Sequence, residues 1–354
     1  MNPMLAKLLL VLLAGILFTL PLLPALTELR LKRDAQPLNV VQQYGGEIRH
    51  FSYGFRTYID DLLDPLLDCV ALGTTVHGTM PNGDQYLLLG RADDTRLVSD
   101  GGKTATCQSL VAAGVDVVLP DETTFAKEVY GIGEITGGEK SVFRALLGEK
   151  GIHLGRASTV TRWVHAVGAF RAERDCDLYG RVSSDREIQL KTGCAFQRMN
   201  APRIVLGCSD AQETDVGADT VPPSLPGGRR LVDEDLEIQA GEIVSTNIVT
   251  RGRLHIGAGA RVIGSVKSHE HIALDTGVHV EGSLISASTM HIGTDCRITG
   301  PVIAERGITI DTGTKCGSLR APITVSAPTI EIADGVTVFG TIWARTEGHV
   351  VPQR

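Results

Sequence analysis

The sequence predicts an all-β fold, a parallel β-helix solenoid with about 18 residues per coil. We expect an N-terminal transmembrane helix and a small α+β cap to precede it. Three observations support this fold: an 18-residue repeat in the last third of the chain, 40 glycines among 354 residues, and an aromatic content of only 5%. Glycine suits tight corners, and few large side chains suit a narrow core.

Four positions of the repeat are apolar in every unit, which predicts short strands whose inward side chains stack in columns. Position one is Leu236, Leu254, Ile272, Met290, Ile308 and Ile330, and position three is Ile238, Ile256, Leu274, Ile292, Ile310 and Ile332. Position nine is Val244, Val262, Val280, Ile298, Cys316 and Val338, and position thirteen is Ile248, Val266, Leu284, Val302, Leu319 (one residue early) and Ile342. Position six is Gly241, Gly259, Gly277, Asp295, Gly313 and Gly335, as expected of corners.

The pattern continues upstream with looser spacing. Val117, Ile135, Ile152, Phe170, Ile188 and Ile204 each fit position one. About twelve coils result, which would make a rod of roughly 58 Å at the usual strand spacing. The acidic, Pro- and Gly-rich segment 208–235 interrupts the pattern and is expected to be a flexible insert.

The N-terminal segment Leu8–Leu26 carries no charge and is long enough for a single membrane span. Leu8, Leu12, Ile16 and Leu20 are its expected anchor residues. Basic residues at 30, 32 and 33 follow it, so the positive-inside rule places the C-terminal part in the cytoplasm, on the inner membrane. A cleaved signal peptide is the alternative.

Between the anchor and the solenoid, residues 49–71 show helical periodicity, and Pro65 is expected to divide them into two helices. Residues 75–116 read as the cap, with a strand at Tyr86–Leu89 and a short helix near Ser109–Ala113. The expected segments are 1–33 (anchor), 34–116 (helical segment and cap), 117–207 (first β-helix section), 208–235 (insert), 236–347 (second section) and 348–354 (tail).

Charge and cysteine content argue against several functions. The net charge of −7 and the lack of a long basic run disfavour a nucleic-acid partner. The seven cysteines form no CxxC, so we expect neither a zinc knuckle nor a disulfide framework, and a reducing compartment fits best.

No motif predicts catalysis or a cofactor. The G-K-T at 102–104 lacks the first glycine of a P-loop because residue 97 is Leu97, and Gly131, Gly133 and Gly137 read as coil corners. His269, Glu270 and His271 would need further zinc ligands, which His255 and His291 are too far apart to supply together. We therefore expect a non-enzymatic protein without cofactors.

Units such as RLHIGAGARVIGSVKSHEHIALDTGVHVEGSLISAS resemble the bactofilins, bacterial polymer-forming cytoskeletal proteins, over residues 117–347. The resemblance implies a right-handed β-helix that assembles end to end without nucleotide into non-polar filaments held at the membrane. The anchor, cap, upstream coils and insert depart from the short family members, in which one shorter β-helix lies between disordered tails.

A β-helix has two ends with unpaired strand edges, so self-association is also expected on physical grounds. The last coil has no evident cap and carries the expected polymerisation interface, Val338, Phe339, Ile342 and Trp343, unless the ten residues after Ala344 fold over it. The expected partners are therefore a second copy of the chain and the membrane, with unidentified protein clients.

Two alternatives remain. Eighteen residues equal three hexapeptides, the coil of left-handed acyltransferase β-helices, although Glu242 and Thr314 at position seven spoil that ladder. A non-polymerising adaptor is the other alternative.

Overall fold

A computed structural model describes residues 48–92, 105–207 and 228–352, together with a few single residues between 4 and 22. Of the expected anchor residues, Leu8, Leu12 and Ile16 lie outside the described residues, and Leu20 begins the 3-10 turn η1 (Leu20–Leu22). Within the described ranges, no helix is long and apolar enough to cross a membrane. Residues 48–354 form one compact unit.

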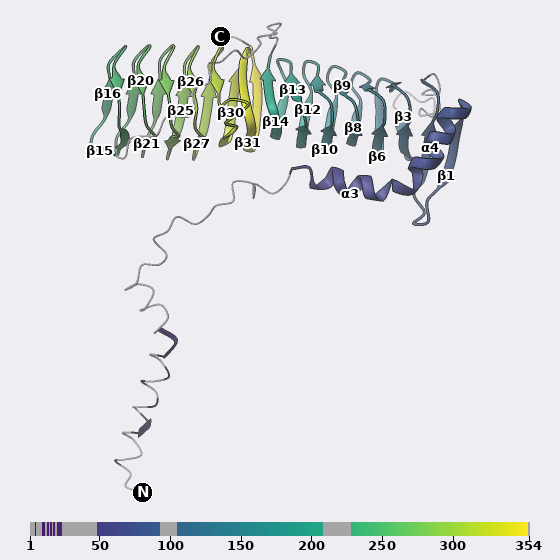
Figure 1. The fold of residues 1–354 in the computed structure, drawn as a ribbon, viewed down its shortest axis with the longest axis horizontal. Coiled ribbons are helices and arrows are strands. Elements are labelled where there is room, and N and C mark those ends of the chain that lie inside the picture. Colours follow the sequence, from purple (N-terminus) through teal and green to yellow (C-terminus); the bar gives the residue numbers. More distant parts are fainter. Residues whose placement is uncertain are drawn as a thin grey trace. The chain divides into compact units, whose positions relative to one another are not determined.

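That unit is a parallel β-solenoid of about 13 turns, so the solenoid part of the predicted fold class, with about 18 residues per coil, is confirmed (Figure 1). Section one contains β2 (Gln85–Leu89), β3 (Ala105–Cys107), β4 (Leu110–Ala113), β5 (Val117–Val118), β6 (Thr123–Gly131), β7 (Ile135–Gly137), β8 (Val142–Gly148), β9 (Ile152–Leu154), β10 (Thr159–Ala166), β11 (Phe170–Ala172), β12 (Asp177–Ser184), β13 (Glu187–Leu190) and β14 (Ala195–Leu206). Strand β1 (Thr75–Thr79) forms an antiparallel hairpin with β2.

Section two contains β15 (Arg229–Val232), β16 (Leu236–Ile238), β17 (Ile243–Val244), β18 (Asn247–Thr250), β19 (Leu254–Ile256), β20 (Arg261–Val262), β21 (Val266–Ser268), β22 (Ile272–Leu274), β23 (His279–Val280), β24 (Leu284–Ser286), β25 (Thr289–Ile292), β26 (Arg297–Ile298), β27 (Val302–Ala304), β28 (Gly307–Ile310), β29 (Lys315–Cys316), β30 (Ile323–Ala333) and β31 (Val336–Val351). Each coil contributes three strands, and each strand pairs in parallel with its equivalent one coil away.

The apolar columns predicted from the repeat form the core. Strand register aligns Leu254 with Ile272 and Ile256 with Leu274, and all four side chains are buried. In section one, the rings of Phe125 on β6 and Phe143 on β8 stack at 4.9 Å, close to the distance between paired strands. Leu319 was wrongly assigned to the core: it is 56% exposed, and Val325 pairs with Val302 in its place.

The corners carry left-handed backbone, which explains the glycines at position six. Gly259 and Gly277 have φ of 67° and 71°, and Asp295 adopts φ of 54° in the unit that lacks the glycine. Section one uses the same conformation with other residues, including Lys140 at 51° and Ala157 at 56°. The corner ladder therefore extends through section one, where the sequence shows no glycine pattern.

The two sections run in opposite directions and meet at their last coils. β14, which ends section one, pairs antiparallel with β31, which ends section two, from Ala195↔His349 to Leu206↔Val336. The expectation that the last coil is an open end is thus wrong. The joint makes one continuous rod, and the first coil of section two, β15–β17, lies at its far end (Figure 1).

Several expected boundaries are wrong for one reason: residues beside the expected β-helix sections also form strands that pair with the neighbouring coils. The helix expected near Ser109–Ala113 is instead strand β4, parallel to both β2 and β6, whereas the strand expected at Tyr86–Leu89 is confirmed within β2. Section two begins at Arg229, inside the expected insert, of which residues 208–227 lie outside the described residues. The expected tail is strand as far as Val351.

Helices α3 (His50–Tyr58) and α4 (Asp60–Leu72) bear out the helical periodicity of residues 49–71. The expected break at Pro65 is wrong: the chain breaks at Ile59, and Pro65 lies inside α4. At the end of α3 the backbone amide of Ile59 donates to the carbonyl oxygens of Phe55 and Arg56, and α4 ends at Gly73 in the left-handed conformation.

Helix α3 lies along the rod and crosses several coils (Figure 1). Arg56 binds Glu149 after β8 through two hydrogen bonds of 2.8 and 2.6 Å, and Arg49 pairs with Asp185 after β12 at 2.9 Å. Arg49 and Arg56 are seven residues apart, which is about 10.5 Å along a helix, and their partners Asp185 and Glu149 lie two coils apart, which is about 9.6 Å along the rod. The two spacings therefore match. Between these ion pairs, Phe55 packs edge-on against Trp163 of β10 at 5.6 Å.

The antiparallel joint can be tested by a disulfide. Asn200 and Thr341 are direct partners across it, and the Asn200 side-chain amide donates to the Thr341 hydroxyl at 2.9 Å. We expect Asn200→Cys/Thr341→Cys to close an intrachain disulfide, seen as faster migration on a non-reducing gel. The control is the pair Asn200→Cys/Thr309→Cys, because Thr309 lies on β28, which pairs with β25 and β30 and not with β14. A free thiol at both positions under oxidising conditions would contradict the joint.

Corner glycines supply a stability test. A Cβ on Gly282 would lie 2.5 Å from the Gly264 carbonyl oxygen, whereas one on Gly241 meets nothing within 4 Å. Gly282→Ala must therefore push two coils apart, and we expect it to lower the free energy of unfolding by about 2–3 kcal/mol. Gly241→Ala pays only for its φ of 72°, roughly 1 kcal/mol. Equal losses in chemical denaturation would refute the steric account.

Candidate functional site

The first coil of section two forms a strand edge at one end of the rod. Strands β15, β16 and β17 pair with β18, β19 and β20, and among the described residues no strand pairs with their other side. The carbonyl oxygens of Glu242 and Val244 accept bonds of 2.8 Å from β20 and the residue after it. Because a parallel strand alternates its bonding sides, the amide of the intervening Ile243 faces away from the rod. Ile243 is 67% exposed.

This edge also carries a charge in a core position. Arg230 of β15 aligns with Ile248, a buried member of the position-thirteen column, yet its own side chain is exposed. A charged residue in an inward position limits indiscriminate pairing of strand edges. Glu242 on the same coil is exposed as well. A second chain that pairs with this edge therefore has to meet Arg230 with a carboxylate.

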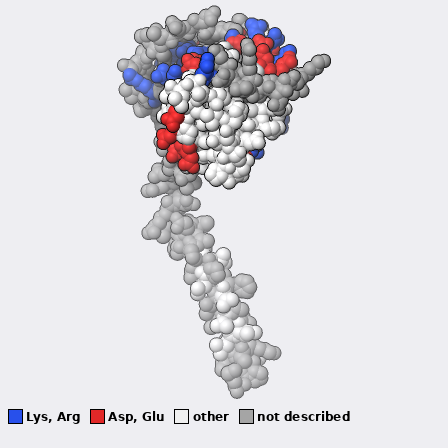
Figure 2. Space-filling view, turned by 90° about the vertical axis from the view of Figure 1, so that its right-hand side faces the viewer, with Lys and Arg blue, Asp and Glu red and all other residues white. Residues whose placement is uncertain are grey.

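The opposite end is formed by the β1–β2 hairpin and α4, and Figure 2 views it end-on. It shows a broad uncharged surface with acidic side chains gathered at one margin. Leu67 and Leu72 of α4 are 54% and 75% exposed, and Val76 of β1 is 40% exposed. The exposed acidic residues of α4 are Asp60, Asp61, Asp64 and Asp68. Here a helix replaces an open coil edge.

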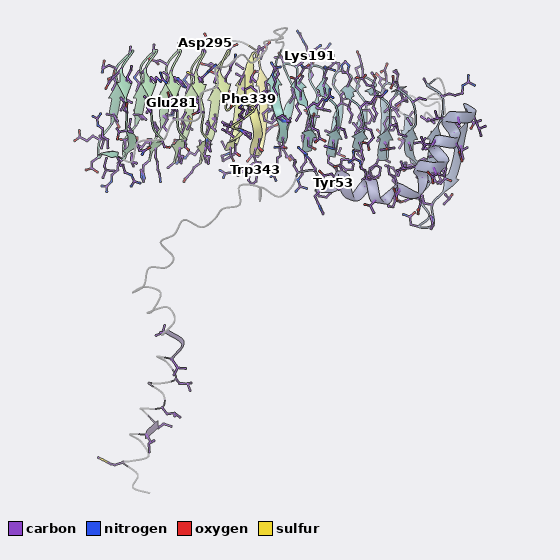
Figure 3. All side chains as sticks on the ribbon, in the orientation of Figure 1. Tyr53, Lys191, Glu281, Asp295, Phe339 and Trp343 are labelled. Carbon is purple, nitrogen blue, oxygen red and sulfur yellow. The ribbon has the colours of Figure 1, made fainter. Side chains whose placement is uncertain are left out.

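The expected polymerisation residues lie in the middle of the rod (Figure 3). Val338 and Ile342 are fully buried opposite Ile204 and Met199 of β14, and Phe339 is 5% exposed. Their apolar character is thus explained by the joint within one chain. Trp343 differs, because it is 42% exposed and the Arg198 guanidinium lies over its ring at 5.0 Å.

The other candidate residues are dispersed. His271 contacts the Thr289 hydroxyl at 2.8 Å, Glu270 pairs with Arg253, and His269 is exposed. No group of three or more metal-binding side chains occurs among the described residues. The G-K-T at 102–104 lies outside them. Of the three glycines expected at corners, Gly133 lies in the bend between β6 and β7, as expected, whereas Gly131 and Gly137 are the last residues of those two strands, so the expectation is wrong for them.

A buried histidine lies on the face that α3 covers. His165 is 2% exposed, and its Nδ1 contacts the Ser183 hydroxyl at 2.9 Å. Burial lowers its pKa below the ordinary value of 6.5, and the charge of Asp185 opposes that shift. Arg49 and Arg56, the two cations of α3, lower it further. Protonated His165 would thus face both docking arginines.

Sequence reasoning missed the edge at β15 because Arg229–Val232 lacks the preceding repeat positions and follows a polar stretch. The 18-residue offset between Leu231 and Val249 is a signal that could have revealed it. The joint between β14 and β31 has no comparable sequence signal, because neither strand contains a pattern that predicts which strand it pairs with.

Comparison with known proteins gave no match: no family model fits the chain, and neither a curated protein nor a solved structure resembles it significantly.

The helix α3 should respond to pH through His165. Because its folded pKa is below 6.5, the unfolded chain binds the proton more readily, so stability falls as the pH drops below about 6.5. We expect the melting temperature to fall between pH 7.5 and 5.5 and α3 amides to exchange faster. His165→Gln should weaken this dependence, whereas His269→Gln at an exposed position should not. A pH profile that His165→Gln leaves unchanged would contradict the assignment.

Proposed function

We propose that this protein is a membrane-associated structural scaffold of the bactofilin type, which self-assembles through its solenoid ends without nucleotide. The free edge of the β15–β17 coil carries the proposal. The regular rod offers long outer faces for client proteins. The uncharged segment Leu8–Leu26 would hold the chain at the membrane, with the solenoid in the cytoplasm.

The joint inside the chain supports this mode of assembly. β14 and β31 join two coil ends antiparallel, with backbone bonds at the perimeter and apolar columns meeting inside. Two copies could join their β15–β17 ends in the same manner about a two-fold axis. Arg230 of one copy would then need a carboxylate such as Glu242 of the other, which makes the contact selective.

Electron microscopy and light scattering on the full-length chain in mild detergent, without nucleotide or metal, test the proposal. We expect elongated assemblies for the wild-type chain and for Ile243→Ala, which keeps the outward amide. Ile243→Pro removes that amide and should reduce the assemblies to single rods, while circular dichroism stays unchanged.

Compact trimers would contradict end joining and favour the acyltransferase alternative. Particles no longer than one rod at all concentrations would favour an adaptor. Equal assembly of the Ile243→Pro and Ile243→Ala variants would exclude β17 from the contact.

A further inference from the structure

One long face of section two carries an exposed row of mostly apolar side chains. The row consists of the outward residues that strand register aligns on β15, β18, β21, β24, β27, β30 and β31, and we call it the lateral row: Leu231, Val249, Lys267, Ile285, Ile303, Ser326 and Trp343. Leu231, Ile303 and Trp343 are 62%, 38% and 42% exposed.

The outward rows on the other two faces of section two are mostly polar, with one apolar residue in each. The face of β17, β20, β23, β26, β29 and β31 carries Ile243, Arg261, His279, Arg297, Lys315 and Thr337. The face of β16, β19, β22, β25, β28 and β30 carries Glu237, His255, Ala273, His291, Thr309 and Glu331. An apolar row with one charge is therefore particular to the remaining face, as expected of a surface that becomes covered.

The lateral row continues a face that is covered in section one. Register carries Trp163 of β10 through Arg181 and Arg198 to Trp343. Helix α3 lies over Trp163. The part of the face that α3 covers stops at the first turn of the helix, where Arg181 lies 4.6 Å from the centre of the Phe51 ring. Figure 3 shows Tyr53 of α3 and Trp343 on the same long edge of the rod. Among the residues that the structure describes, none covers this face from Arg198 to β15.

We propose that a second copy of this chain covers the lateral row, face to face and antiparallel, about a two-fold axis along β24. Eight strands lie between the end of α3 and the end of the rod; β14 with Arg198 comes first, the other seven carry the lateral row, and β24 is the middle one of these seven. With the axis there, the end of each rod stops one strand short of the partner's α3, so the whole lateral row is covered without a clash.

Within the row, this arrangement matches apolar with apolar side chains. Trp343 meets Leu231 of the partner subunit, and Ile285 meets its own equivalent. Lys267 lies over Ile303 of the partner subunit, which can pack on its aliphatic stem. A parallel arrangement would instead set Lys267 against its own equivalent, which is unfavourable.

The neighbouring row at the corner of the same face supplies charge complementarity. Its exposed charged residues include Asp233 beyond β15, which pairs with Arg251 of its own chain at 3.3 Å, and Arg345 in β31, and the axis brings Arg345 of the partner subunit to Asp233. Glu305 and His269, at equal distances on either side of β24, are brought together as well. The residues nearest the axis, Ser283, Ile285 and Ala287, carry no charge, so no like charges meet there.

The face is small. Six strand spacings give a length of about 29 Å, and three alternating outward positions give a width of about 13 Å, hence roughly 400 Å² per copy. That size belongs to weak interfaces, so we expect the dimer to form at high local concentration, as on a membrane or within an assembly.

Cysteine cross-linking on the axis tests the dimer. Ser283 is half-exposed beside β24 and faces its own equivalent, so Ser283→Cys should give a disulfide-linked dimer of the full-length chain under mild oxidation. Cys208→Ser provides the background, because the six described cysteines are all buried. Ala273→Cys, half-exposed on β22 of another face, is the matched control and should cross-link at least tenfold less.

Charge reversal gives a second, independent test. Asp233→Arg and Arg345→Asp should each reduce the Ser283→Cys cross-link severalfold, and the double variant should restore it. Failure of the double variant to restore it, or equal cross-linking at Ala273→Cys, would overturn the proposal. The lateral dimer does not rest on end joining, so Ile243→Pro should leave this cross-link intact.

Discussion

The backbone pairing of each coil with the next is the interaction on which the rest of this structure depends. It requires every coil to repeat the cross-section of its neighbour within the spacing of paired strands. Inward side chains of the same type then stack on one another in successive coils, as Phe125 does on Phe143. Corners must also coincide, and this is why Gly264, Gly282 and Gly300 follow one another where a Cβ would strike the coil before.

The reversal between β14 and β31 follows from the same requirement at the ends of the sections. A coil end exposes backbone groups and an apolar cross-section, and the chain satisfies two such ends by joining them. Val338 and Ile342, two apolar residues near the C-terminus, are buried inside this joint. The ends that remain are different from each other: α4 and a hairpin cover one, and β15–β17 with Arg230 form the other.

The same outer face of the rod is covered in one section and exposed in the other. On section one, α3 covers apolar residues such as Tyr130 and Trp163 and fixes its position through Glu149 and Asp185. The spacing of its arginines fits the spacing of the coils, so a helix can follow a solenoid for several turns. On section two the same face keeps Ile303 and Trp343 exposed, and the proposed dimer rests on this observation.

The sequence by itself determined the coil length, the four inward columns of section two and the glycine corners, because these depend on a period that is local in the chain. It also predicted the helices at 49–71 from their apolar periodicity. Only the tertiary structure decided that the two sections oppose each other, that β4 is a strand, and that the last coil is internal. Those outcomes depend on contacts between residues as distant as Met199 and Ile342, and no local pattern encodes which edges meet. The left-handed corners of section one, at Lys140 and Ala157, were hidden because coil pairing imposes that conformation on residues that do not favour it.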